Sequence, residues 1–300
     1  MSTSTSASLA DPKVQPAARV DPVLANAPLK IGRVALTVRD LASMSRFYQQ
    51  ALGLKLIEQD RRSALFGTEA AALLELRHDP DARARSPREA GLFHTAFLLP
   101  ERADLGAWVA YAAQQRLRLL GASDHLVSEA VYLTDPEGNG IEIYTDRPSA
   151  DWPRSDGMID MPSERLDLRD VVDAGAGRTW FGFPSGGVVG HVHLQVGEIK
   201  AAESFYADLL GLDITCRYPG GSFYGSGGYH HQLATNVWNS QGAPVRSDGA
   251  TGLADVEILA EPSVLEAVRS RLPALSPAAR NSASMSLRDP WGTSITLRAP

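Results

Sequence analysis

The sequence predicts an α+β fold built from four βαβββ modules. Three internal similarities in the 300-residue chain support this prediction. Residues 31–54 are similar to 189–212, 91–99 to 252–260, and 135–138 to 289–292, in the same order along the chain. The first similarity keeps one offset without a gap. Chance explains one such match easily and three ordered matches poorly, so the chain is a duplication.

Each half begins with a strand and a helix. Val34, Leu36 and Val38 alternate with polar or small residues, a pattern typical of a strand with one buried face. Asp40 is a candidate N-cap of the following helix and Gly53 is its candidate C-terminal stop.

The rest of the first half follows the same pattern. A turn of sequence DPEGNG at 135–140 separates its last two strands, because Pro, Gly and Asn favour tight turns. We expect strands at 56–58, 73–76, 93–98, 130–134 and 141–144, and a helix at about 104–115.

Sequence position divides the modules into two predicted domains. Residues 1–28 are rich in Ser, Thr, Ala and Pro without periodicity, which predicts a flexible segment. Residues 29–147 and 187–300 are expected to form one two-module domain each. Residues 148–186, rich in Pro, Gly and charge, are expected to be a linker with a short helix near 164–174.

Composition excludes several classes of protein. The net charge of −6 disfavours a nucleic-acid partner, which requires clustered Lys and Arg. No apolar run approaches the roughly 20 residues that span a bilayer, so no membrane partner is expected. The single cysteine, Cys216, excludes a disulfide framework and a Cys-clustered zinc site. We expect a cytoplasmic protein with a small-molecule partner, and its oligomeric state stays open.

Alternation along the strands predicts which side chains face away from the helices. His191 and His193 alternate with apolar residues, and so does Tyr132. Glu142 lies between two isoleucines and is expected to face the same way. Because a buried carboxylate is costly without a charged partner or a metal, Glu142 is a candidate functional residue.

Two stretches carry a family resemblance. DHLVSEAVYLTDPEGNGIEIY at 124–144 and GYHHQLATNVW at 228–238, within four βαβββ modules, resemble the vicinal oxygen chelate superfamily. This superfamily includes glyoxalase I, bleomycin-resistance proteins and extradiol dioxygenases. The resemblance covers residues 31–297 and is strongest to two-domain bacterial catechol-2,3-dioxygenase-like proteins. It implies modules paired into two cupped, mixed-sheet half-barrel domains that hold a divalent metal.

The resemblance also implies metal ligands. His94 and Glu142 occupy the two ligand positions of one module. The third ligand comes from the first strand of the paired module, where Arg33 stands in this half and cannot bind a cation. Glu75 could complete the site or pair with Arg33, and we favour the ion pair. His125 is the tentative third ligand.

Further residues match catalytic positions of the family. Tyr132, ten residues before Glu142, resembles a tyrosine that bonds a metal-bound phenolate oxygen. His230 and His231 resemble paired histidines near the oxygen site, where an imidazole can shuttle protons. Strand alternation favours His230 as the one that faces the cup. Candidate substrate-binding residues are His191, His193, Arg33 and Glu75.

The leading hypothesis is an extradiol ring-cleaving dioxygenase that uses a non-haem metal, an aromatic substrate with vicinal oxygens, and O2. Fe(II) is the first choice of metal, with Zn(II), Mn(II) or Ni(II) as alternatives. A second hypothesis is a glyoxalase-like isomerase or lyase using Glu75 and Glu142. A third is a non-catalytic small-molecule-binding protein of the bleomycin-resistance type, which Arg33 and Thr296 in ligand positions would favour.

Overall fold

The structure is a computed structural model that describes residues 21–272 and 282–300. Residues 1–20, most of the predicted flexible segment, lie outside the described part. Residues that follow them are ordered into a short helix, α1 (Pro22–Ala25), which Asp21 caps at its N-terminus. No described helix is both long and apolar enough to span a membrane.

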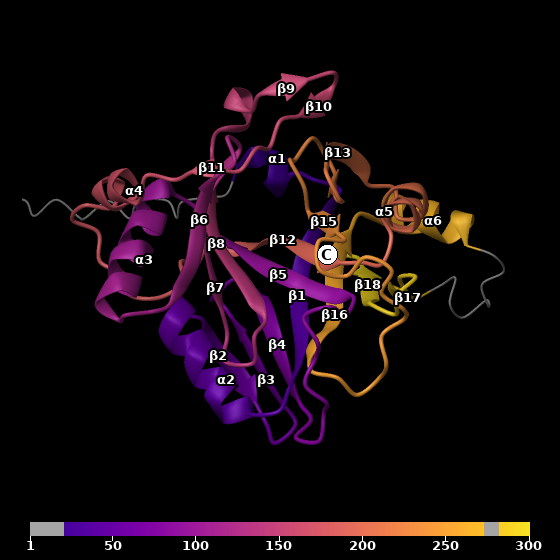
Figure 1. Cartoon of the computed structure of the whole chain (residues 1–300), viewed down its shortest axis with the longest axis horizontal. Coiled ribbons are helices and arrows are strands. Elements are labelled where there is room, and N and C mark those ends of the chain that lie inside the picture. The colour runs from indigo at the N-terminus through magenta and orange to yellow at the C-terminus, as the bar shows by residue number, and fades with distance from the viewer. Residues whose placement is uncertain (1–20, 273–281) are drawn as a thin grey trace, which may run out of the picture.

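Two large mixed sheets contain most of the strands, which confirms the predicted fold class (Figure 1). The first sheet has seven strands, in the order β17 (Ser284–Arg288), β18 (Ser294–Arg298), β16 (Gly252–Ala260), β1 (Leu29–Val38), β4 (Ala72–His78), β3 (Ser63–Gly67) and β2 (Lys55–Gln59).

The second sheet has nine strands. Their order is β11 (Glu164–Arg165), β6 (Leu119–Asp124), β7 (Ser128–Thr134), β8 (Gly140–Asp146), β5 (Gly91–Leu98), β12 (Val188–Gln195), β15 (Leu233–Asn236), β14 (Gly221–Gly225) and β13 (Asp213–Tyr218). A separate hairpin pairs β9 (Arg154–Ser155) with β10 (Met158–Ile159).

The pairing of modules differs from the grouping that sequence position predicts. The seven-stranded sheet joins the first module to the fourth, and the nine-stranded sheet joins the second to the third. Residues 29–147 and 187–300 therefore do not form separate two-module sheets. All four modules share one hydrophobic pattern, so the first strand of any module can pair with the first strand of any other. The sequence pattern does not choose between these pairings.

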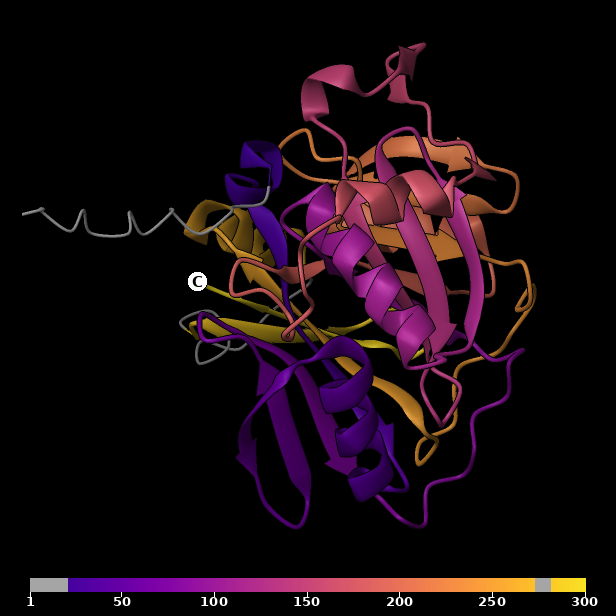
Figure 2. The same cartoon turned by 90° about the vertical axis from the view of Figure 1, so that its left-hand side faces the viewer.

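The helices cover the outer faces of the sheets (Figure 2). They comprise α2 (Leu41–Phe47), continued by the π-helix η1 (Tyr48–Leu52); α3 (Arg102–Gln114); α4 (Leu168–Ala174); α5 (Ile199–Glu203), continued by the π-helix η3 (Ser204–Leu209); α6 (Pro262–Arg271); and a 3₁₀ turn, η2 (Ser149–Asp151). The Asp40 carboxylate accepts from the Ser43 amide, and Gly53 has φ of 72°. Both predicted boundaries of the first helix are confirmed.

The segment between the two halves is more ordered than the predicted linker. Glu164 and Arg165, expected to begin a helix, instead form β11 and pair with β6. The helix begins later because Asp167 caps it, accepting from the amides of Arg169 and Asp170. Met161 and Ser163 of this segment reach the cavity described below.

A buried tyrosine–aspartate hydrogen bond occurs once in each half. The Tyr48 hydroxyl donates to Asp135 Oδ2 at 3.0 Å, and the Tyr206 hydroxyl donates to Asp289 Oδ2 at 2.9 Å. In each half the bond ties the first helix to the Asp-Pro turn of the next module. Burial, together with the neighbouring carboxylate, raises the pKa of both tyrosines well above the usual value, so both remain donors. This contact explains why the helix motif and the turn motif are duplicated together.

We expect Tyr206→Phe to lower the free energy of unfolding by about 1–3 kcal/mol, because it leaves a buried carboxylate without one of its donors. Urea denaturation measures this change. Tyr218→Phe, which alters a half-exposed tyrosine, is the control and should leave stability unchanged. Equal stability of Tyr206→Phe and the control would contradict a stabilising role for the bond.

Candidate metal and substrate site

The nine-stranded sheet curls around a cavity of about 290 Å³ between the second and third modules. This volume is close to the lower end of the range for small-molecule sites, about 300–1,000 Å³. The cavity is lined by Phe93, His94, Ser123, His125, Val127, Ser128, Tyr132, Glu142, Met161, Ser163, His191, His193, Tyr218, Phe223, His231 and Trp238.

Strand register places three polar side chains around one small residue. Ala96 of β5 pairs with Glu142 of β8 on one side and with His191 of β12 on the other. His94 lies two residues before Ala96 and therefore on the same face of β5. The methyl group of Ala96 leaves the space between these side chains free. The inward direction that alternation predicts for Glu142 and His191 is confirmed.

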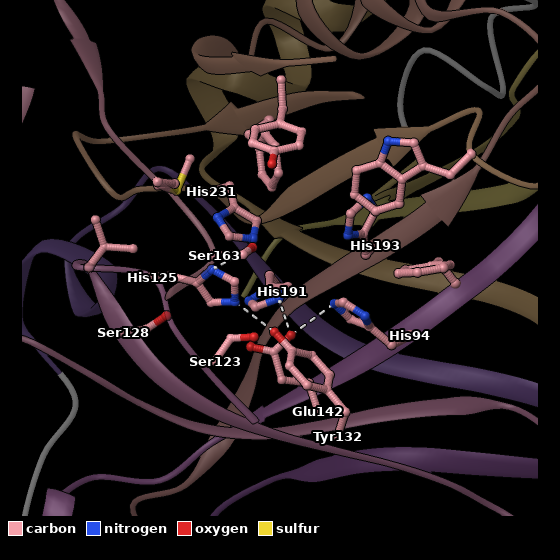
Figure 3. Close-up of a pocket in the computed structure, with 16 residues that line it drawn as sticks. His94, Ser123, His125, Ser128, Tyr132, Glu142, Ser163, His191, His193 and His231 are labelled. Carbon is pink, nitrogen blue, oxygen red and sulfur yellow. Dashed lines mark hydrogen bonds and ion pairs between the residues drawn. The ribbon is translucent and has the colours of Figure 1, made fainter. Parts of the chain in front are cut away.

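These three side chains converge (Figure 3). His94 Nε2 lies 3.0 Å from Glu142 Oε2, and His191 Nε2 lies 3.4 Å from the same oxygen. One potential ligand atom from each residue lies within 4.8 Å of the other two. All three side chains are buried.

The donor set fits a divalent cation. Ligand atoms about 2.1 Å from a cation and at right angles to each other lie about 3.0 Å apart, close to the distances found. His94 Nε2 is buried without a hydrogen-bond partner, because its contact with Glu142 lacks suitable direction. Buried polar atoms are nearly always bonded, so this atom indicates a missing partner. Two imidazoles and one carboxylate are the ligands of the facial triad of non-haem iron enzymes.

The protonation of these groups also suits a cation. Burial lowers the pKa of His191 to about 4, so its imidazole is neutral near pH 7. Burial alone would raise the pKa of Glu142, but the adjacent His191 and His94 hold it well below its usual value. The cluster therefore offers a carboxylate anion and an unprotonated imidazole, the forms that bind metals.

His125 is not near enough to be the third ligand, contrary to prediction. Its Nδ1 donates to the Pro162 carbonyl at 2.8 Å, since that oxygen can only accept. Its Nε2 lies 2.7 Å from the Tyr132 hydroxyl. Both nitrogens of His125 have partners, and it is His191, from the paired module, that lies beside His94 and Glu142. Tyr132 faces the cavity as predicted.

The two adjacent histidines exchange their predicted directions. His231 lines the cavity, whereas His230 is buried beside Asp146. Alternation favoured His230, but the strand begins only at Leu233. The two histidines precede it in irregular backbone, to which the alternation rule does not apply.

Hydrogen bonds link these histidines into a chain. The Asp146 carboxylate accepts from His230 Nε2 at 2.9 Å. His230 Nδ1 lies 2.7 Å from His231 Nδ1. Burial and the surrounding imidazoles lower the pKa of His231 well below its usual value. His231 Nδ1 faces His230, and the His231 ring forms part of the cavity wall.

His193 also lines the cavity, as predicted. The Asn236 side-chain amide donates to its Nε2 at 3.0 Å, and burial holds its pKa well below the usual value. Sequence analysis missed Asn236 and also missed Trp238 as a cavity residue. The available signal was that Asn236 ends the strand after the paired histidines and that Trp238 follows it by two residues.

Arg33 and Glu75, predicted as substrate-binding residues, lie in the seven-stranded sheet, away from this cavity. Arg33 lies 3.5 Å from Glu75 and 3.6 Å from Glu257. The favoured ion pair is therefore present, and Glu75 does not approach Glu142. The position equivalent to Glu142 in that sheet, Thr296, donates to Asp255 at 2.9 Å.

The fold and the converging site define a class of protein. Residues 30–143 and 188–254, more than half of the chain, match the Glyoxalase/Bleomycin resistance protein/Dioxygenase superfamily. The chain belongs to this family. It is 37% identical over 228 residues to "Catechol-2,3-dioxygenase" of Bacillus subtilis (strain 168), covering 74% of this chain and 80% of that protein.

Solved structures agree on the fold. A Bacillus subtilis protein provisionally described as a dioxygenase has a TM-score of 0.60 at 15% identity, covering 90% of this chain and 84% of that one. A glyoxalase I variant from Zea mays has a TM-score of 0.54 at 16% identity, covering 92% and 95% of the two chains. These identities are too low to carry an argument beyond the fold.

We expect Glu142→Gln to lower the affinity for a divalent metal at least tenfold. Loss of a residue that only hydrogen-bonds a metal ligand already lowers metal affinity by about 10–100-fold. Elemental analysis of protein purified without chelator, followed by titration with Zn(II), measures the change. Glu75→Gln is the matched control, because that carboxylate lies in the other sheet, and it should bind metal like the unchanged protein. Equal losses in both variants would contradict a metal site at Glu142.

Proposed function

We propose that the protein is an extradiol dioxygenase that opens the ring of a catechol-like substrate with O2, using Fe(II). The convergence of His94, Glu142 and His191 in a cavity large enough for one aromatic ring carries the proposal. The similarity to a catechol-2,3-dioxygenase supports the same chemistry. A cytoplasmic location fits a chain with a single cysteine.

The proposed ligands are His94, Glu142 and His191. When bound there, Fe(II) would supply Lewis acidity and a template for two vicinal oxygens and O2. In the overall reaction a ring bond beside a hydroxylated carbon breaks, and both atoms of O2 enter the product. No external reductant is therefore required.

Tyr132 and His125 are proposed to orient one substrate hydroxyl. The Tyr132 hydroxyl lies 2.7 Å from His125 Nε2 and faces the cavity, where it would hydrogen-bond a substrate oxygen. The Pro162 carbonyl fixes the tautomer of His125. The segment between the two halves thus contributes to the site through its backbone.

His231 is proposed to accept a proton when a substrate hydroxyl ionises. In this proposal His230 carries its proton on Nε2, toward Asp146, and accepts from His231 Nδ1, so that the Nε2 of His231 would carry the free lone pair. Asp146 and His230 are positioning residues in this proposal, because they act on the substrate through His231. An aspartate that holds a histidine in its working tautomer is a recurring arrangement in catalysis.

No observation favours the two alternative functions. The isomerase hypothesis required Glu75 together with Glu142, and these lie in different sheets. The binding-protein hypothesis depended on Arg33 and Thr296 in ligand positions, which also belong to the other sheet. His191 stands in the ligand position where Arg33 was expected to prevent metal binding.

The direct test is to load the protein anaerobically with Fe(II), add catechol and then admit oxygen. We expect oxygen uptake and a new absorbance from the ring-opened product. Glu142→Gln should abolish both signals, and Glu75→Gln should retain them. Iron-loaded protein that consumes no oxygen with any catechol would refute the proposal, and turnover without oxygen would favour an isomerase.

We expect Asp146→Asn to lower kcat by about 100-fold with little change in KM, since general acid–base groups contribute about 10²–10⁴-fold. Nitrogen-15 NMR of the zinc-loaded protein should show the tautomer of His231 changing. Tyr229→Phe is the matched control, because Tyr229 also bonds Asp146 without belonging to the chain that reaches His231. A tautomer that is unchanged in Asp146→Asn would exclude the positioning role.

A further inference from the structure

One end of the cavity is aromatic. Five residues, Phe93, His193, Tyr218, Phe223 and Trp238, form what we call the aromatic wall. The ring centroids of Phe93 and Trp238 lie 5.5 Å apart, and those of Trp238 and Tyr218 lie 6.4 Å apart, both edge to face. His193 joins the wall at 5.0 Å from Phe93 and 5.3 Å from Trp238. The rings therefore form a continuous surface.

The outer part of this wall is exposed but held in place. Trp238 is 45% exposed and Tyr218 is 44% exposed. The Trp238 indole nitrogen donates to the Pro219 carbonyl at 2.9 Å, and its backbone amide donates to the Asn236 side chain. A fixed group of adjacent exposed rings is typical of a surface that a ligand covers.

Apart from a metal bound at His94, Glu142 and His191, the cavity offers no cation to a charged substituent of a ligand. None of the described residues that line it is Lys or Arg. A carboxylate that entered would lose hydration without gaining a partner, which is costly.

We propose that this site selects catechols that are uncharged and carry an apolar substituent, and discriminates against catechols that carry a carboxylate. The inference rests on the proposed function in one respect, which is that the two catechol hydroxyls lie beside His94, Glu142 and His191. With the hydroxyls there, the rest of the ring lies toward the aromatic wall. The wall and the absence of Lys and Arg from the described lining then decide which substituents bind.

Binding, rather than turnover, tests this selectivity. The protein is loaded with Zn(II), which does not activate oxygen, and titrated anaerobically in a calorimeter near pH 7. The probes are 3,4-dihydroxybenzoate and its methyl ester, which share the two hydroxyls and differ in charge. We expect the ester to bind at least about tenfold more tightly, because the acid buries an unpaired charge. Equal affinities, or no binding of the ester, would overturn the inference.

Two variants locate the effect. Tyr218→Arg places a cation at the mouth of the cavity and should reduce the preference for the ester at least severalfold. Val245→Arg is the control, because Val245 is 64% exposed and does not line the cavity. It should leave the preference unchanged. The same change in both variants would mean that net charge, and not the wall, sets the preference.

The outcomes separate this inference from the proposed function. A Zn(II)-loaded protein that prefers the ester, while the Fe(II)-loaded protein opens no ring, would refute the dioxygenase and leave the selectivity standing. If the Fe(II)-loaded protein opens the ring of both probes and the Zn(II)-loaded protein binds them with equal affinity, the selectivity is refuted and the dioxygenase stands.

Discussion

The antiparallel pairing of β5 with β12 is the constraint on which the site depends. His94 and Glu142 belong to one module, and strand order within that module brings them together. The third donor, His191, lies beside them only because β12, the first strand of the third module, pairs with β5, the first strand of the second module. Ala96 at the centre of this register keeps the space between the three side chains open. A larger residue at that position would fill the place where their ligand atoms meet.

The seven-stranded sheet contains the equivalent pairing of first strands, β1 with β16, but different side chains meet there. Arg33 stands at the position equivalent to His191, and its guanidinium lies between Glu75 and Glu257. Clustered carboxylates in a partly buried hollow require a nearby cation. One copy of the duplicated cup contains a covalently attached cation, and the other brings together three side chains that could hold an exchangeable one. The two cups differ at each of the three ligand positions, where Arg33, Asp255 and Thr296 stand in place of His191, His94 and Glu142.

Local pattern predicted the elements and the direction of side chains on regular strands, including Glu142 and His191. It could not predict which modules pair, because all four carry the same alternation, and so it assigned His125 in place of His191. It also misdirected His230, since the regular strand begins two residues after His231, at Leu233. The partner that fixes His230 is Asp146, 84 residues earlier in the chain. A contact of that sequence separation leaves no periodic signal.

Burial connects the two properties proposed for the cavity. Several imidazoles packed together would repel a metal if they were protonated, but burial lowers the pKa of His191, His193 and His231. The ionised Glu142 then contributes the main fixed charge among the described residues that line the cavity. A single carboxylate in surroundings of low polarity attracts a cation more strongly than it would in water. A charged substituent that lies against the aromatic wall, away from the metal, would lose hydration without gaining a charged partner.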